Sequence, residues 1–381
     1  MSRFLFLTWN GAGNQPPAAA IAQALEKRGH QVTFAGYENQ RTYFAARGFR
    51  FVIVGRSSAA WRDESPDRMF AVKLQTAWAS SDHLFDLPQL ISQERCDAMI
   101  IDCLMFGALA AAEKSNVPTA ALVHSAPGAL MPPKGQFESL VLGPVNDVRN
   151  RAGLPEVESL WEAWARFPSL SNSIRQLDPL ASQAPESFIY CGPVADELEQ
   201  PGWRSPWPAD DRRPLVLVSF STGPYWDQSS RILRTLRAVC GRDCRALVTA
   251  GSVEVDPSEV PDNVVIARHV PHEAVLPNVA VTVTHAGHGT VLASLKHGVP
   301  MVCLPNRAAD QPILAAQVGQ LGCGVPLDGD NATPIQIREA IDRLLSEPSY
   351  TANARLLADA ISKSLGLSHA VSRLEQLAER L

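Results

Sequence analysis

Two series of short apolar runs, separated by helix-length segments, constrain the fold of this 381-residue chain most strongly. The runs cover residues 3–9, 31–36, 49–55, 98–104, 119–125 and 188–194, then 215–222, 245–251, 263–270, 279–286, 300–305 and 324–327. Strands that alternate with helices in this way form parallel sheets covered on both faces. The pattern predicts an α/β protein with two doubly wound parallel-sheet, Rossmann-like domains that face a cleft with their carboxyl strand ends.

The boundary between the two series is predicted from composition. Residues 195–214 contain four prolines and many charged side chains, which is typical of an interdomain linker. We therefore expect one domain over residues 1–200, a linker over 201–214, a second domain over 215–365 and a C-terminal helix over 366–381. Within these domains the pattern predicts one long helix over about 67–94, helices over about 334–346 and 350–380, and no strand over 127–187.

Composition excludes several classes of protein. Hydrophobic residues make up 46% of the chain and charged residues 19%, which is typical of a well-buried protein rather than a disordered one. The net charge of -5, without a basic stripe, indicates no nucleic-acid partner. No apolar run approaches the roughly 20 residues of a membrane span, so we expect no stable membrane insertion.

The seven cysteines indicate a reducing compartment. They form no CxxC pair, and most stand in apolar strand-like runs, where buried thiols are common. The initial segment MSRFLFLTWNG has too short an apolar core for a signal peptide and predicts a first strand. We expect a cytoplasmic protein, either a monomer or a homodimer.

The segment THAGHGT, residues 284–290, stands where a predicted buried strand passes into a helix. Glycines let the backbone turn tightly and approach a ligand, and the first free N–H groups of a helix form an anion site suited to phosphate. A glycine-rich turn with no ligand is the plain alternative. Asp310 and Gln311 open the next helix, where they suit a polyhydroxylated ligand, although an aspartate there also serves as an ordinary N-cap.

Residues 270–327, VPHEAVLP through GCGVPL, resemble the nucleotide-sugar donor signature of family 1 glycosyltransferases, most closely the bacterial antibiotic and natural-product enzymes. Residues 11–36 resemble the opening of the family's acceptor domain. The resemblance implies the two-domain GT-B fold and a metal-independent, inverting transfer of a hexosyl or deoxyhexosyl group. The donor would be a dTDP- or UDP-sugar co-substrate without any cofactor, and the acceptor a small hydrophobic natural product. It also implies that residues 1–200 bind the acceptor and that the C-terminal helix packs back on them.

The same resemblance assigns residues to the donor. His285 and the backbone of Gly289 and Thr290 would hold the diphosphate. Val270 and Arg268 would flank the nucleobase. Asp310 and Gln311 would bind sugar hydroxyls. The full donor set is Ser221, Thr222, Arg268, Val270, His285, Gly287, His288, Gly289, Thr290, Asp310 and Gln311. Two positions depart from the family pattern. Ala286 replaces a glycine and is expected to need only an ordinary φ, and His272 stands where many members have glutamine.

The catalytic base is not given by the family pattern, which has a histidine in a Gly-His-x-x-Pro context after the first strand. This chain has GNQPP at 13–17, and the amide of Asn14 cannot act as a base. We expect Asp102 first and His124 second as the base, with Asn14 orienting the acceptor. Three alternatives stay open. Asp102 could cap the helix that begins at residue 106, and His124 could be a histidine of the cleft wall whose hydrogen bonds are satisfied within the protein. An acidic acceptor could also react without a strong base.

Aromatic residues of the first half offer candidates for an acceptor pocket. Trp61, Phe70 and Trp78, with Asn14 and His124, would line it, although core packing is the plain alternative for each aromatic side chain. Two other functions remain open: a nucleotide-sugar 2-epimerase and a non-catalytic nucleotide-sugar-binding helper of a partner transferase. NAD-dependent hydride transfer is disfavoured, because GAGNQP lacks the third glycine of a dinucleotide fingerprint.

Overall fold

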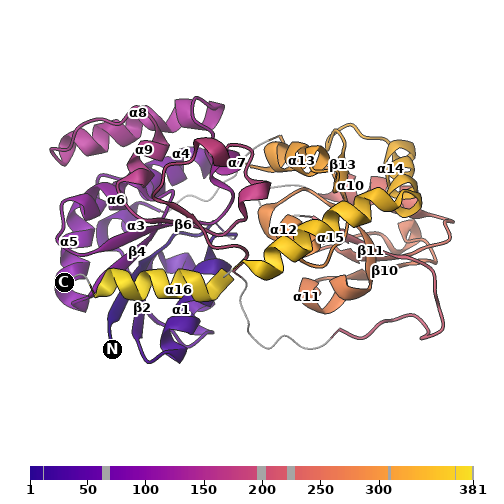
Figure 1. The fold of residues 1–381 in the computed structure, drawn as a ribbon, viewed down its shortest axis with the longest axis horizontal. Helices are drawn as coiled ribbons and strands as arrows, with labels where there is room; N and C mark the ends of the chain where they lie inside the picture. Colours follow the sequence, from indigo (N-terminus) through magenta and orange to yellow (C-terminus); the bar gives the residue numbers. More distant parts are fainter. Residues whose placement is uncertain are drawn as a thin grey trace. The chain divides into compact units, whose positions relative to one another are not determined.

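The structure is a computed structural model that describes residues 1–11, 13–61, 69–194, 203–220, 228–307, 310–364 and 366–379. The chain divides into two compact units (Figure 1). Unit 1 comprises Met1–Arg175, Leu180–Glu197 and Leu365–Leu381, and unit 2 comprises Gln176–Pro179 and Leu198–Ser364. Each unit contains one sheet in which every strand pair is parallel, so the predicted pair of doubly wound α/β domains is confirmed.

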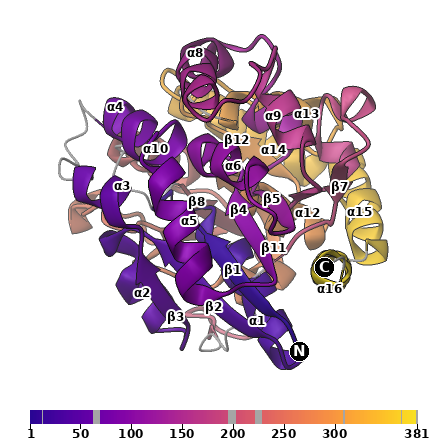
Figure 2. The ribbon, with the colours of Figure 1, turned by 90° about the vertical axis from the view of Figure 1, so that its left-hand side faces the viewer.

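The sheet of unit 1 has the strand order β3-β2-β1-β4-β5-β6-β7 (Figure 2). Its strands are β1 Arg3–Leu7, β2 Gln31–Gly36, β3 Arg50–Ile53, β4 Ala98–Asp102, β5 Thr119–Val123, β6 Ser169–Ser171 and β7 Phe188–Tyr190. Its helices are α1 Gln15–Lys27, α2 Arg41–Ala45, α3 Gly55–Ala60, α4 Met69–Lys73, α5 His83–Glu94, α6 Phe106–Glu113, α7 Pro127–Leu130, α8 Gln136–Arg151, α9 Leu160–Ala165 and α16 Gly366–Ala378. Because successive side chains of a strand face opposite ways, Phe4 and Phe6 of β1 join one core, and Leu5 and Leu7 join the other.

The C-terminal helix α16 belongs to unit 1. Val371 and Leu374 lie in the same core cluster as Ile21 of α1, and Figure 1 shows α16, in yellow, beside α1. Glu375 of α16 forms a salt bridge of 2.7 Å with Arg28, just after α1. An apolar stripe and a peripheral ion pair therefore attach the last helix to the first domain.

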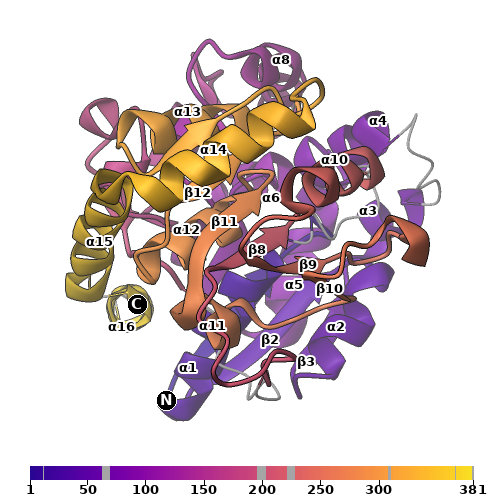
Figure 3. The ribbon, with the colours of Figure 1, turned by 90° about the vertical axis from the view of Figure 1, so that its right-hand side faces the viewer.

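The sheet of unit 2 has the strand order β10-β9-β8-β11-β12-β13 (Figure 3). Its strands are β8 Leu215–Ser219, β9 Arg245–Thr249, β10 Val264–Ala267, β11 Val279–Thr284, β12 Met301–Cys303 and β13 Gly324–Pro326. Its helices are α10 Ser229–Val239, α11 His272–Val275, α12 His288–Lys296, α13 Gln311–Gln320, α14 Pro334–Ser346 and α15 Pro348–Lys363. Val216 and Val218 of the central strand β8 pack on one side with Ile232 of α10 and Ile337 of α14.

Both sheets reverse their strand order beside the first strand. In unit 1, β1 lies between β2 and β4, and in unit 2, β8 lies between β9 and β11. In doubly wound sheets, ligands bind outside the carboxyl ends of the strands at such a reversal point. The turns after β1 and β4, and after β8 and β11, are therefore the places to look for function.

Three sequence-based predictions about elements are wrong. The segment 67–94 is not one helix: a short π-helical stretch, Leu74–Trp78, follows α4, and α5 begins only at His83. Ser80, Ser81 and Asp82 fill the interruption, and such side chains compete with the helix for backbone hydrogen bonds. The helix predicted over 350–380 is two helices, α15 and α16, and Gly366 at the start of α16 has a φ of 49°. The strand β6 was missed because its three residues include two serines and form no apolar run.

Among the described residues, no helix combines the length and the apolar character that crossing a membrane requires.

Candidate functional site

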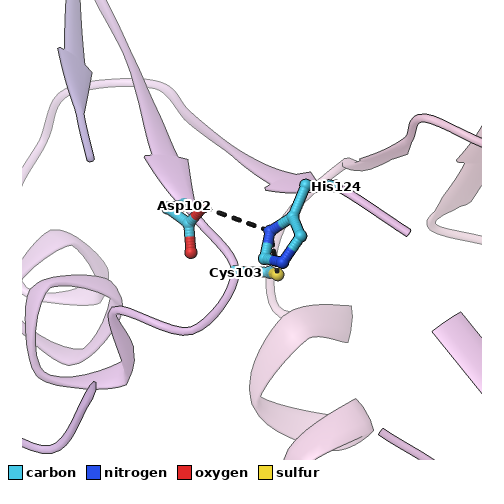
Figure 4. Close-up of side chains that lie close together, drawn as sticks. All are labelled: Asp102, Cys103 and His124. Carbon is cyan, nitrogen blue, oxygen red and sulfur yellow. Dashed lines mark hydrogen bonds and ion pairs between the residues drawn. The ribbon is translucent and has the colours of Figure 1, made fainter. Parts of the chain in front are cut away.

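The Asp102 carboxylate, at the end of β4, is the centre of a buried hydrogen-bond network in unit 1. Its Oδ1 accepts from the indole Nε1 of Trp9 at 2.9 Å and from the backbone N–H of Leu104 at 3.0 Å. Its Oδ2 accepts from Nδ2 of Asn14 at 2.9 Å and pairs with Nδ1 of His124 at 3.2 Å (Figure 4). The side chain is 3% exposed, so four partners from three strand ends saturate a carboxylate that water hardly reaches.

Local sequence explains why Trp9 and Asn14 converge on this carboxylate. Trp9 continues the face of β1 that carries Leu5 and Leu7, and it belongs to the same core cluster. Gly11 leaves room for the indole, because a Cβ there would stand 2.8 Å from two of its carbons. Asn14 is held at both ends of its amide, since Nδ2 also donates to the Trp9 carbonyl at 3.0 Å and Oδ1 accepts from the Gly11 N–H at 3.2 Å. The role of Trp9 was missed from sequence, although its strand register could have shown it.

Electrostatics favours an ionised Asp102 beside a protonated His124. Burial alone would raise the pKa of Asp102, but the charge and hydrogen bond of His124, with the bond from Asn14, hold it below its ordinary value. Burial alone would lower the pKa of His124, but the neighbouring Cys103 sulfur and Asp102 carboxylate raise it well above the ordinary value. The plain alternative, that Asp102 caps α6, is wrong, because the N-cap of α6 is Met105.

Cys103 lies beside the pair, with Sγ 3.7 Å from Nδ1 of His124. One polar atom each from Asp102, Cys103 and His124 lies within 4.8 Å of the other two, close enough for a single cation to reach all three (Figure 4). The hydrogen bonds to Asp102 account for this group without an ion, and burial raises the pKa of the Cys103 thiol, which favours its neutral form.

Two of the three predicted acceptor aromatics belong to one aromatic cluster next to this network. The Trp78 ring centroid lies 5.6 Å from that of Trp9, 5.5 Å from that of Phe70 and 5.1 Å from that of Phe137. Phe70 is 40% exposed, whereas Trp9 and Trp78 are buried. Trp61 packs elsewhere, against Tyr37 with a centroid distance of 4.9 Å. The cluster therefore extends from the indole that binds Asp102 to an aromatic ring at the surface.

In unit 2, the turn after β11 presents the start of helix α12. Gly287 is the N-cap, so no side chain caps the helix, and the first turn holds no carboxylate. Among the described residues, no partner accepts from the backbone N–H groups of Gly289 and Thr290. A Cβ on Gly289 would meet nothing within 4 Å. Amide dipoles without a cap or counter-charge are suited to an anion, so this helix start stays the candidate for the predicted anion site.

His285 folds back over this turn. A Cβ on Gly287 would stand 2.4 Å from Nε2 of His285, so only glycine leaves room for the ring. Burial lowers the pKa of His285 to about 4. The charge of Arg231 acts in the same direction, and a backbone hydrogen bond at Ser219 acts against it. At neutral pH His285 is therefore a neutral imidazole, able to donate one hydrogen bond.

The expectation of an ordinary φ at Ala286 is wrong. Ala286 has a φ of 61° and is completely buried. The left-handed conformation places a Cβ too close to the carbonyl oxygen that follows, which is why glycine usually occupies it. The chain stores local backbone strain at the turn that presents α12.

Ala286→Gly should raise the free energy of unfolding by about 0.5–1 kcal/mol, because relief of the strain exceeds the added flexibility of the unfolded chain. Urea denaturation of the two proteins measures the difference. The same substitution at Ala293 inside α12 is the matched control and should lower stability by about 1 kcal/mol. Equal losses in both variants would contradict a strained Ala286.

Gln311, the first residue of α13, has a fixed amide. Its Oε1 accepts from both the backbone N–H of Asn306 at 3.0 Å and Nδ2 of Asn306 at 2.8 Å. Because the oxygen is occupied, the Nε2 group is what Gln311 can offer a ligand. Asp310 is the N-cap residue of α13, as the plain alternative expects, but its side chain forms no capping hydrogen bond. Asn306 was missed from sequence, since nothing in the pattern indicates an asparagine that orients a neighbouring amide.

Of the remaining predicted donor residues, Arg268 and Val270 follow β10 and His288 begins α12, and Ser219 at the end of β8 lies near the loop after β10. Ser219 Oγ lies 3.0 Å from Nε2 of His272 and 2.9 Å from Oγ1 of Thr249. Val270 is buried and Arg268 is exposed, at the loop between β10 and α11. His288, in the first turn of α12, is buried. Ser221 and Thr222 lie outside the described residues.

Comparison with known proteins agrees with this architecture. Residues 234–377 match the family model "Erythromycin biosynthesis protein CIII-like, C-terminal domain". The chain is 27% identical to 4'-demethylrebeccamycin synthase of Lentzea aerocolonigenes, an alignment that covers 99% of each protein. Over 47% of its length it is 30% identical to the 3-alpha-mycarosylerythronolide B desosaminyl transferase of Saccharopolyspora erythraea, of which the alignment covers 42%.

Solved structures share the fold over the whole chain. The calicheamicin glycosyltransferase CalG4 has a TM-score of 0.79 and 22% identity, with 100% of this chain and 99% of that chain covered. The glycosyltransferase VinC, solved in complex with dTDP, has a TM-score of 0.73 and 20% identity, with both chains covered completely. The chain thus has the GT-B fold of these solved glycosyltransferases, and its sequence is similar to that of enzymes of antibiotic and natural-product biosynthesis.

Proposed function

We propose that this protein is a glycosyltransferase, a metal-independent, inverting enzyme that transfers a hexosyl or deoxyhexosyl group from a dTDP- or UDP-sugar to a small hydrophobic natural product. The observation that carries the proposal is the start of α12, which no side chain caps and where a Cβ on Gly289 would meet no protein atom within 4 Å. The complex of VinC with dTDP supports a thymidine nucleotide as the first donor to try.

Charge stabilisation at α12 explains how a diphosphate could leave without a metal ion. As the glycosidic bond to phosphate breaks, negative charge grows on the diphosphate oxygens. Preorganised N–H groups at a helix start stabilise such charge without reorganisation. The neutral ring of His285 adds one donor beside them. We propose that Ser221 and Thr222, which follow β8 in the sequence, contact the same phosphate or the sugar.

Sugar recognition is proposed for the start of α13. Asn306 fixes the amide of Gln311 so that Nε2 donates to a sugar oxygen, and the carboxylate of Asp310 accepts from a sugar hydroxyl. Val270 and Arg268 would flank the nucleobase of the donor. On unit 1, Asn14, Phe70, Trp78 and His124 would bind the acceptor, and the aromatic cluster supplies the apolar surface for it. Trp61, which packs against Tyr37, would act only at its edge.

Gly289→Ala tests the anion site directly. Because the Cβ meets nothing in the protein, alanine should stabilise the helix start by up to about 1 kcal/mol. If the diphosphate lies against this helix start, the same methyl group should weaken dTDP binding about tenfold or more, a cost near 1.4 kcal/mol. Urea denaturation measures the first effect and isothermal titration with dTDP the second.

Gly143→Ala is the control for binding. Gly143 is also an exposed helical glycine with open space at its Cβ position, but it lies in α8 of unit 1. This variant should bind dTDP as the wild type does. Unchanged dTDP affinity in Gly289→Ala would contradict the proposed phosphate site. Incubation of the wild type with dTDP-glucose alone separates the other functions: an epimerase changes the donor without an acceptor, and a helper binds it but transfers to no acceptor.

A further inference from the structure

We infer that His124 is the general base of the transfer, held by Asp102 as a positioning residue, and that Asn14 has no proton-transfer role. The inference rests on the proposed function. It differs from the order expected from sequence, which placed Asp102 first, and it assigns the base to the end of β5 rather than to the loop after β1.

Asp102 is poorly placed to take a proton from an acceptor. Each carboxylate oxygen already has two partners. Oδ1 accepts from Trp9 and Leu104, and Oδ2 accepts from Asn14 and pairs with His124. An acceptor hydroxyl would have to displace one of these partners in a site that is almost closed to solvent. Each displaced donor would be left unsatisfied, at a cost of about 1–3 kcal/mol.

His124 has the arrangement that Asp102 lacks. Its Nδ1 points at the Asp102 Oδ2, so a proton on Nδ1 is donated to the carboxylate and Nε2 keeps its lone pair in the neutral ring (Figure 4). Among the described residues, none forms a hydrogen bond with Nε2, and the side chain is 14% exposed. The carboxylate therefore sets the tautomer and also stabilises the imidazolium once it forms.

The step balances without a further reactant. The acceptor oxygen forms its bond to the anomeric carbon while that carbon loses its bond to the diphosphate oxygen. The electron pair of the broken bond leaves with the diphosphate. The acceptor proton moves to Nε2 of His124, which becomes an imidazolium beside the Asp102 carboxylate.

The pair also fixes the expected pH dependence. The titratable groups that face His124 in the described part of the chain are Asp102 and Cys103, both at the end of β4. A base works only when deprotonated, so kcat/KM should rise with pH through the pKa of His124. Since that pKa lies above its ordinary value, the rise should occur above pH 6.5. If Asp102 were the base, its lowered pKa would place the rise in the acid range.

The decisive variant is His124→Asn, because the asparagine amide can keep donating to Asp102 while the ring nitrogen Nε2 is lost. With dTDP-glucose as donor, we would compare 4-nitrophenol, which ionises in mildly alkaline buffer, with 4-nitrobenzyl alcohol, which does not. In this variant kcat for the alcohol should fall by a factor of about 10²–10⁴, and kcat for the phenol should fall much less, because an ionised acceptor needs no base. Added imidazole should restore part of the alcohol reaction.

Two controls keep the outcome interpretable. His297→Asn removes another histidine that pairs with a carboxylate, Glu273 at 3.0 Å, and should leave both reactions unchanged. Titration with dTDP should give the same affinity in His124→Asn as in the wild type. If the wild type itself did not bind dTDP, the result would contradict the proposed function rather than the identity of the base.

Nitrogen NMR of histidine-labelled protein tests the inference without an acceptor. Above its pKa, His124 should carry its proton on Nδ1 and none on Nε2. A proton on Nε2 in the neutral ring, or equal loss of the phenol and alcohol reactions in His124→Asn, would overturn the inference. Asn14→His in the His124→Asn background asks the converse question, and recovery of the alcohol reaction would show that Asp102 can position a base from either side.

Discussion

Asp102→Ala is expected to lower the free energy of unfolding of unit 1 by about 3–5 kcal/mol, the usual cost of removing one partner of a buried ion pair. The indole of Trp9, the amide of Asn14 and the N–H of Leu104 lose their acceptor together. Transfer to an alcohol should fall by about 10²–10⁴ in kcat, since His124 loses the group that orients it. Urea denaturation and single-turnover assays with dTDP-glucose measure the two effects.

Asp102→Asn separates the two roles of this residue. The amide oxygen can still accept from Trp9 and Leu104, and the NH₂ group can donate to a neutral His124 at Nδ1, although Nδ2 of Asn14 loses its acceptor. The structure should then be largely retained, but His124 would carry its proton on Nε2 and could not take another. Activity should therefore fall as far as in Asp102→Ala, with most of the stability kept. Near-wild-type turnover in Asp102→Asn would show that the negative charge is not needed.

Gly287→Val is expected to have the second large effect, on both stability and dTDP affinity. The backbone of Gly287 has φ -64° and ψ 138°, which valine adopts easily, so any cost comes from the side chain alone. Its Cβ would overlap the ring of His285, which must move out of a closed site at a cost of about 1–3 kcal/mol. Loss of a hydrogen bond to a charged phosphate, worth about 1.5–3 kcal/mol, should weaken dTDP binding roughly 10–100-fold.

A double-mutant cycle tests whether the ring is the cause. In a His285→Ala background the space that the valine needs is empty, so Gly287→Val should cost little further stability and little further dTDP affinity. The same loss of stability in both backgrounds would mean that the valine disrupts something other than His285. Thermal unfolding with and without dTDP reports both quantities in one experiment.

Most of the fold could be predicted because the strands carry a strong local signal. Buried parallel strands such as β8, LVLVS, and β11, VAVTVT, are continuous apolar or β-branched runs, and the segments between them have helix length. Prediction failed where no such signal exists. The three residues of β6 contain two serines, and their pairing with β5 depends on contacts distant in sequence. The helix near residues 67–94 is interrupted at a polar segment that periodicity alone does not reveal.

The candidate site divides in the same way. The glycines of the α12 turn and the Asp310–Gln311 pair could be named from sequence, because their chemistry depends on neighbours along the chain. Sequence alone indicated neither the strained φ of Ala286 nor the bond from Asn306 to Gln311. The first depends on backbone geometry imposed by the surrounding turn, and the second on where a loop places one amide.

By itself, the sequence determined that this chain folds as two parallel α/β domains and that a helix start rich in glycine and histidine follows β11, since both are properties of local pattern. Only the tertiary structure decided which partners surround Asp102. Trp9 and Asn14 come from the turn after β1 and His124 from the end of β5, and the order in which β1, β4 and β5 stand side by side brings them to Asp102 at the end of β4. Strand order is set by packing across the whole sheet, so no window of sequence contains it.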